Sequence, residues 1–168
     1  MITTGPMSAQ ELQEAVLNHH VKLVPKDNSW LMKSIAKTLT TVKSSAARKF
    51  MTTGTIVLGH TIYYPKNRSP WWFHEELHHD LIHISQWEKY GLWYLGSYIA
   101  LWFPILGSWW RWRWEREAFL TNVRWHAMPI EEAVETIWKE YFHPWPKKEM
   151  TDWFHMHSLE REYIKDKR

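Results

Sequence analysis

The stretch that decides the fold is residues 73–86, which read FHEELHHDLIHISQ. Four of the eleven histidines of the chain fall within it, interleaved with carboxylates and apolar residues. Side chains four residues apart lie on the same face of an α-helix. The stretch therefore predicts a helix that carries two pairs of histidines, each pair able to offer two nitrogen ligands to a metal ion.

The two pairs define two possible registers of one metal-binding motif. His74-Glu75-x-x-His78 matches HExxH, in which the Glu acts as a base on a metal-bound water. Residues 79–83 repeat the spacing with Asp80 in place of the Glu. The pairs begin five residues apart, about 140° around a helix, so they cannot bind the same ion. The flanking sequence favours the second register, and the first is kept as the alternative.

Two later features support the second register. Gln86 follows His79 by seven residues, and residues 112–119 read WRWEREAF, which contains the pattern E-x-E-A. Here the chain resembles the gluzincin-type metallopeptidases, especially the short zincin-like proteins of tailed bacteriophages. In that family an H-E-x-x-H-x-x-Q helix is followed by a helix with E-x-E-A, whose first Glu is the third metal ligand.

The resemblance implies a zinc site and a role for each matching residue. It assigns His79, His83 and Glu115 as ligands of Zn²⁺. Gln86 matches the family motif, and Glu117 either supports the ligands from behind or pairs with a neighbouring arginine. Asp80 would be the base, and because its side chain is shorter than Glu by one methylene, its carboxylate would sit about 1 Å farther from the water, which can cost ~100-fold in rate.

The resemblance covers residues 48–126, within one domain that spans residues 1–168. Residues 49–58 and 61–64 are rich in Thr, Ile, Val and Tyr, which predicts a short hairpin like the edge strands of the family. The remaining patterns predict helices, so we expect a mainly α protein with a small β-hairpin or sheet edge (α+β) around a zincin-like core. Besides the motif helix, the expected helices cover residues 8–20, about 28–39, 92–103, 109–127, 129–141 and 147–166. A capping box at Ser8 and Glu11 is expected to start the first of them. Pro70 is expected to open the motif helix and Gly91 to cap its end, and a turn is expected at residues 104–108.

Composition adds limits and one unusual feature. The chain has no cysteine, so disulfides and thiolate metal sites are excluded. No signal peptide is recognised at the amino terminus, and we expect a protein of the host-cell cytoplasm or of the virion. Fourteen residues are Trp, seven of them between Trp87 and Trp114. Large aromatic residues fill cores and also mark interfaces, so the excess predicts a tryptophan-rich surface for a protein partner.

Two other kinds of partner are disfavoured by the sequence. Net charge is only +3, and the alternation of Arg and Trp at residues 110–116 is more typical of a helix with a buried aromatic stripe than of nucleic-acid binding. Residues 91–110 carry no charge, but Pro104 and three glycines interrupt them. This composition disfavours a membrane-spanning helix and leaves docking at a membrane surface as a further alternative.

The sequence thus predicts a zinc-dependent peptidase-like protein whose substrate is a peptide or protein. The main alternative is a zincin scaffold that has little or no activity and serves as a virion or assembly component. The shortened Asp80 and the tryptophans favour that alternative. Tyr63, Tyr64 and His126 are candidates for stabilising an oxyanion, and the sequence does not select among them.

Overall fold

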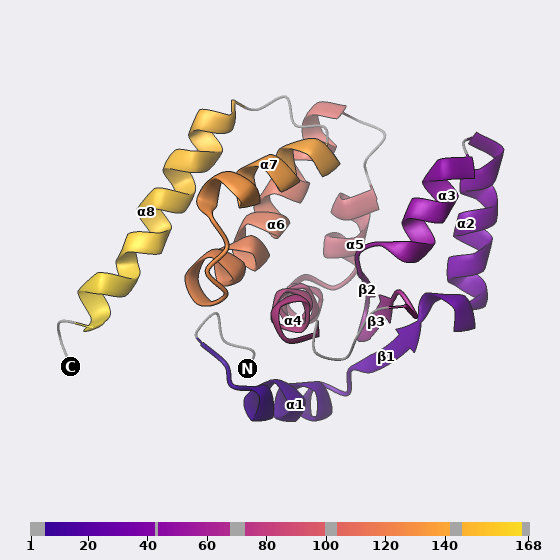
Figure 1. The fold of residues 1–168 in the computed structure, drawn as a ribbon, viewed down its shortest axis with the longest axis horizontal. Helices are drawn as coiled ribbons and strands as arrows, with labels where there is room; N and C mark the ends of the chain where they lie inside the picture. Colours follow the sequence, from indigo (N-terminus) through magenta and orange to yellow (C-terminus); the bar gives the residue numbers. More distant parts are fainter. Residues whose placement is uncertain (1–5, 43, 68–72, 100–103, 142–145, 166–168) are drawn as a thin grey trace.

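The computed structural model describes residues 6–42, 44–67, 73–99, 104–141 and 146–165 (Figure 1). Within these ranges, side chains are described except for residues 41–47, 73–75, 98–99, 104–108, 140–141 and 159–165. The described chain is mainly helical and carries one small sheet. This arrangement confirms the predicted α+β class.

The motif helix α4 (Phe73–Tyr90) lies near the centre of the fold, where Figure 1 views it almost along its axis. Helices α1 (Ala9–Asn18), α5 (Leu92–Ile99) and α6 (Pro104–Trp125) pack around it. The predicted end of α4 is confirmed, because Gly91 has a φ of +54° and its N–H donates to the Trp87 carbonyl at 2.7 Å. A positive φ is easily adopted only by glycine, which makes Gly91 the natural C-cap.

The first helix confirms the predicted capping box. The backbone N–H of Glu11 donates to the Ser8 hydroxyl, and the Ser8 N–H donates to the Glu11 carboxylate. Leu12 and Ala15 of α1 join Ile62, Leu81, Ile82, Ile84 and Ala118 in one buried apolar cluster. The apolar face of α4 is therefore covered by α1, the sheet and α6 together.

The sheet has three short strands in the order β1-β3-β2. The predicted hairpin is confirmed, with β2 (Ile56–Leu58) antiparallel to β3 (Thr61–Tyr64). Its predicted start was wrong, because residues 49–52 are the last turn of α3 (Ser44–Thr52). The sequence analysis also missed β1 (Lys22–Pro25), which pairs in parallel with β3.

A buried lysine ties α3 to the sheet. Lys26, in the short 3₁₀ helix η1 (Lys26–Asn28), is only 1% exposed. Its ammonium donates to the carbonyls of Phe50, Thr53 and Gly54 at 2.6–2.9 Å. These oxygens lie at the end of α3, where helical carbonyls lack partners within the helix. A cation there also complements the negative end of the helix dipole.

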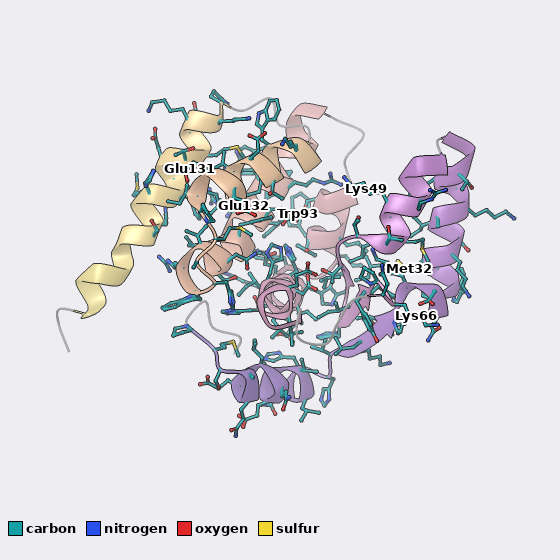
Figure 2. The ribbon with its side chains drawn as sticks, viewed as in Figure 1. Met32, Lys49, Lys66, Trp93, Glu131 and Glu132 are labelled. Carbon is teal, nitrogen blue, oxygen red and sulfur yellow. The ribbon has the colours of Figure 1, made fainter. Side chains whose placement is uncertain are left out.

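The second helix, α2 (Trp30–Val42), packs on α3. Its start agrees with the prediction, because the Ser29 hydroxyl accepts a hydrogen bond from the backbone N–H of Met32. Met32, labelled in Figure 2, is a buried residue of α2, whereas Trp30 is 78% exposed. The large aromatic side chain at the start of α2 therefore points into solvent.

The connection between α5 and α6 differs from the prediction in part. Residues 104–108 were expected to form a turn, but they form the first turn of α6, which begins at Pro104. Proline fits the first position of a helix because its missing N–H would have no helical partner there. The predicted extension of α5 through residues 100–103 lies outside the described residues, as does the predicted helix start at Pro70.

The last two helices complete a second apolar cluster. Helices α7 (Ile130–Tyr141) and α8 (Lys147–Lys165) pack on α6, and both agree with the predicted helices to within a few residues. The buried members of this cluster are Phe119, Leu120, Ala133, Val134, Ile137, Met150 and Phe154. Among the described helices, none combines the length and the apolar character that a membrane span requires.

Candidate metal centre

Three side chains from the two central helices meet between α4 and α6. His79 and His83 project from successive turns of α4, and their Nε2 atoms are 3.2 Å apart. The Glu115 Oε2 atom of α6 lies 3.5 Å from each of these nitrogens. We call these three residues the buried cluster, because Glu115 is 1% and His83 5% exposed. The structure therefore brings together the three residues assigned by the second register.

A glutamine fixes the orientation of His83. The side-chain NH₂ of Gln86 donates to the Trp114 carbonyl and to the Glu117 carboxylate, both at 3.0 Å. Since these two oxygens only accept, the Gln86 Oε1 atom faces the His83 ring and accepts from its Nδ1–H at 2.9 Å. In neutral His83 the lone pair is then on Nε2, directed at the cluster. Gln86 thus contacts a candidate ligand directly, and Glu117 contacts Gln86.

The electrostatics of the buried cluster favour a cation at its centre. Burial opposes a charged imidazole, but the Glu115 carboxylate outweighs it and raises the pKa of His83 to about 9. Burial likewise works against the Glu115 charge, yet His83 and His79 hold the pKa of Glu115 well below its usual value. Two nitrogens and one oxygen that face one another as acceptors need a positive charge between them, either a proton or a metal ion.

Aromatic side chains line the buried cluster. The ring of Phe119 meets the His79 ring edge to face at 4.8 Å, and the Tyr94 ring lies 6.3 Å from the His83 ring. Tyr94 is 4% exposed, and burial raises its pKa, with further contributions from Glu115 and Asp80. Its phenol therefore stays protonated. Tyr94 was not among the tyrosines predicted to stabilise an oxyanion, because no sequence motif marks it.

The proposed base lies next to the cluster but is not part of it. Asp80 is 3% exposed, and its Oδ1 atom accepts a hydrogen bond from the Thr55 hydroxyl at 2.9 Å. The pKa of Asp80 is raised, because burial outweighs the opposing effects of His79, His83 and Thr55. Thr55 immediately precedes β2, so the hairpin holds the acidic side chain of α4. Sequence reasoning missed Thr55, because a single threonine carries no recognisable spacing.

The alternative register is described only in part. The side chains of His74 and Glu75 lie outside the described residues. His78 is fully buried, and its Nδ1 atom is 3.3 Å from Nε2 of His126, the residue that follows α6. This contact joins α4 to the end of α6. It also engages the ring of His126, a residue that the sequence suggested for oxyanion stabilisation.

Among the described residues, the buried cluster is the one group of three or more histidine or acidic side chains whose ligand atoms all lie within 4.8 Å of one another. It can hold a metal ion. Comparison with known proteins gives no matching family model, no similar curated sequence and no similar solved structure.

Proposed function

We propose that this protein is a zinc-dependent peptidase with a zincin-type site. The observation that carries the proposal is the triangle of donor atoms in the buried cluster, with sides of 3.2, 3.5 and 3.5 Å. A tetrahedral zinc ion with bonds of about 2.0–2.1 Å needs ligands about 3.3–3.4 Å apart. Two imidazoles and one carboxylate are also the ligand set of many catalytic zinc sites, which keep a fourth position for water.

The resemblance to the gluzincin-type peptidases supports the reaction class. When bound, zinc would make a coordinated water acidic and polarise a substrate carbonyl. The role proposed for Asp80 is to accept the proton of the attacking water and to pass it to the leaving amine. Thr55 holds one oxygen of Asp80, which sets the direction of its carboxylate.

The sheet supports a peptide or protein as the substrate. Strand β2 lies at the edge of the described sheet and packs beside α4. An extended peptide can add to such an edge through backbone hydrogen bonds. Thr55, one residue before β2, contacts Asp80, so a peptide held at this edge would pass close to the proposed base.

Metal analysis tests the ligand set. We expect the purified protein to contain one equivalent of zinc by elemental mass spectrometry, and His83→Ala to lose it. His60→Ala is the matched control, because this exposed histidine lies outside the cluster and its loss should leave the zinc in place. Loss of zinc in His74→Ala but not in His83→Ala would move the site to the first register.

Hydrolysis of unfolded casein tests the reaction. We expect Asp80→Asn to lower the rate by ~100-fold or more, which is typical for removal of a general base. Asp80→Glu should raise the rate, since the longer side chain restores the reach of the family motif. Zinc-loaded, folded protein without activity in any of these forms would refute the peptidase.

Asp80 also favours one alternative function. A short carboxylate with one oxygen engaged by Thr55 is a poorer base than the Glu of the family motif. The alternative is therefore a zincin scaffold without turnover that acts as a virion or assembly component. It predicts zinc binding without hydrolysis, even in Asp80→Glu.

A further inference from the structure

An exposed patch of tryptophan side chains lies where α5 and α6 begin. Leu92 is 78%, Trp93 60% and Trp109 37% exposed. The rings of Trp93 and Trp109 both meet the ring of Trp110 edge to face, at 5.6 and 4.8 Å. We call these four residues the tryptophan patch; Trp93 is labelled in Figure 2. Ring contacts join the three tryptophans across two helices, and Leu92 precedes Trp93 in the chain.

Buried aromatic side chains lie beneath the tryptophan patch. Trp110 stacks on Trp114 at 5.9 Å, and Trp114 is 1% exposed. The indole N–H of Trp114 donates to the Ser97 hydroxyl of α5 at 3.0 Å, which joins the two helices. The core beneath the patch is therefore already filled by Trp114 and Tyr94, whose rings are 5.4 Å apart. The outer rings are not needed to close it, so their exposure calls for another explanation.

All charged residues in the stretch of sequence that contains the patch are basic. No acidic residue occurs from Lys89 to Trp114, whereas this stretch contains Lys89, Arg111 and Arg113. The Arg113 guanidinium lies 5.7 Å from the ring centres of both Trp109 and Trp110. One cationic side chain, that of Arg113, therefore stacks directly on the aromatic surface of the patch.

We propose that the tryptophan patch docks the protein on an anionic membrane surface. Indole rings favour the boundary between lipid headgroups and acyl chains, where they are half dry and half wet. Arginine and lysine beside them pair with lipid phosphates and gain from the negative surface potential. The contact is superficial: Leu92 and Trp93 enter the interface while the basic side chains remain among the headgroups.

A protein partner is the competing occupant, because Trp and Arg are also common at protein interfaces. The charge pattern favours the membrane. A lipid surface supplies uniform negative charge, which matches the Arg113 guanidinium on the patch and a stretch of sequence, residues 89–114, that has no acidic residue. The proposal is independent of the peptidase, since no residue of the patch belongs to the buried cluster or contacts Asp80 in the described structure.

Vesicle sedimentation with the full-length protein tests the docking. We expect the protein to sediment with vesicles that contain phosphatidylglycerol and to bind vesicles of pure phosphatidylcholine less. Replacing both Leu92 and Trp93 by Glu should lower partitioning at least about tenfold, because charged side chains do not enter the interface. Arg113→Gln should lower it about fivefold, the value of one basic residue near an anionic surface.

Trp30→Glu is the matched control. Trp30 is as exposed as Leu92 but lies on α2, so this variant should bind vesicles like the unchanged protein. Circular dichroism should show the same helix content in all variants, since every changed position is at the surface or half-buried. An unchanged protein that ignores anionic vesicles would overturn the proposal and assign the patch to a protein partner. An equal loss in Trp30→Glu would overturn it too.

Discussion

Within the described part of the chain, two histidines and a glutamate meet in at least two places, and these two places differ in how closely they resemble a metal site. Besides the buried cluster, His19 and His60 both contact Glu88 at the surface. The Glu88 Oε1 atom lies 2.7 Å from Nδ1 of His19 and 3.3 Å from Nε2 of His60. We call these three residues the surface cluster. The residue types are identical, so the difference must come from how the chain holds them.

The two clusters differ in the elements that supply their histidines. Both histidines of the buried cluster come from one helix, whose repeat fixes their separation. In the surface cluster, His19 follows the end of α1, His60 lies in the β2–β3 turn, and Glu88 is in the last part of α4. Within the described residues, three ligand atoms lie within 4.8 Å of one another only in the buried cluster.

The two glutamates also differ in their contact with water. The Glu115 side chain is 1% exposed and that of Glu88 is 34% exposed. Water screens the charge of Glu88, whereas the charge of the buried Glu115 is stabilised by neighbouring side chains, among them His79 and His83. Burial and preorganisation, more than composition, therefore separate a metal site from an ordinary surface contact.

The sharpest test of this comparison exchanges each glutamate for its uncharged isostere. Glu115→Gln should lower zinc affinity by more than the ~10–100-fold that is typical for a residue behind a ligand. Glu88→Gln should leave zinc affinity unchanged. Competition with a chromophoric chelator measures both values, and similar affinities in the two variants would show that the buried cluster does not hold the metal.

A second test removes the support of one ligand and keeps the ligands themselves. Gln86→Met preserves the length of the side chain but can no longer accept from His83 Nδ1. We expect zinc affinity to fall by about 10–100-fold, because the ring loses its fixed tautomer and orientation. Gln10→Met, on the exposed face of α1, is the control. Unchanged affinity in a stably folded Gln86→Met would mean that helix spacing alone orients the histidines.

The smallest effect is expected in the surface cluster, and it depends on pH. Partial burial works to raise the pKa of Glu88, but hydrogen bonds from His19 and His60 hold it below the ordinary value of 4.5. A lowered pKa stabilises the fold above 4.5, and the contribution is lost as the pH falls through the folded value.

Glu88→Gln should therefore reduce the free energy of unfolding at neutral pH, by no more than about 1 kcal/mol because the group is partly exposed. The difference from the unchanged protein should close as the pH drops below 4.5. Urea unfolding across this range measures it. A gap that widens in acid would contradict the assignment.

The sequence predicted those parts of the molecule that depend on local patterns. Ser8 and Glu11 marked the start of α1 and Gly91 the end of α4; helix spacing paired His79 with His83, and the family resemblance added Glu115. Each of these signals is contained in a few residues of one helix, or in a motif recognised by resemblance.

The features that were missed depend on contacts between distant parts of the chain. Strand β1 has only four residues, and its pairing with β3 joins positions about forty residues apart, such as Lys22 with Thr61. Thr55 and Lys26 act through side-chain hydrogen bonds to groups far along the chain, which leave no periodic pattern in the sequence. The prediction of a turn at residues 104–108 was wrong because a proline that begins a helix cannot be distinguished by sequence from one that interrupts a helix.

The buried ammonium of Lys26 limits how far the chain can be shortened. Both Lys26 and β1 lie upstream of residues 48–126, the span that the family resemblance covers. A fragment confined to that span would leave the carbonyls of Thr53 and Gly54 without their cation, immediately before the residue that holds Asp80. We therefore expect that residues 48–126 do not fold independently. Transplanting the site onto another scaffold would require the upstream residues as well.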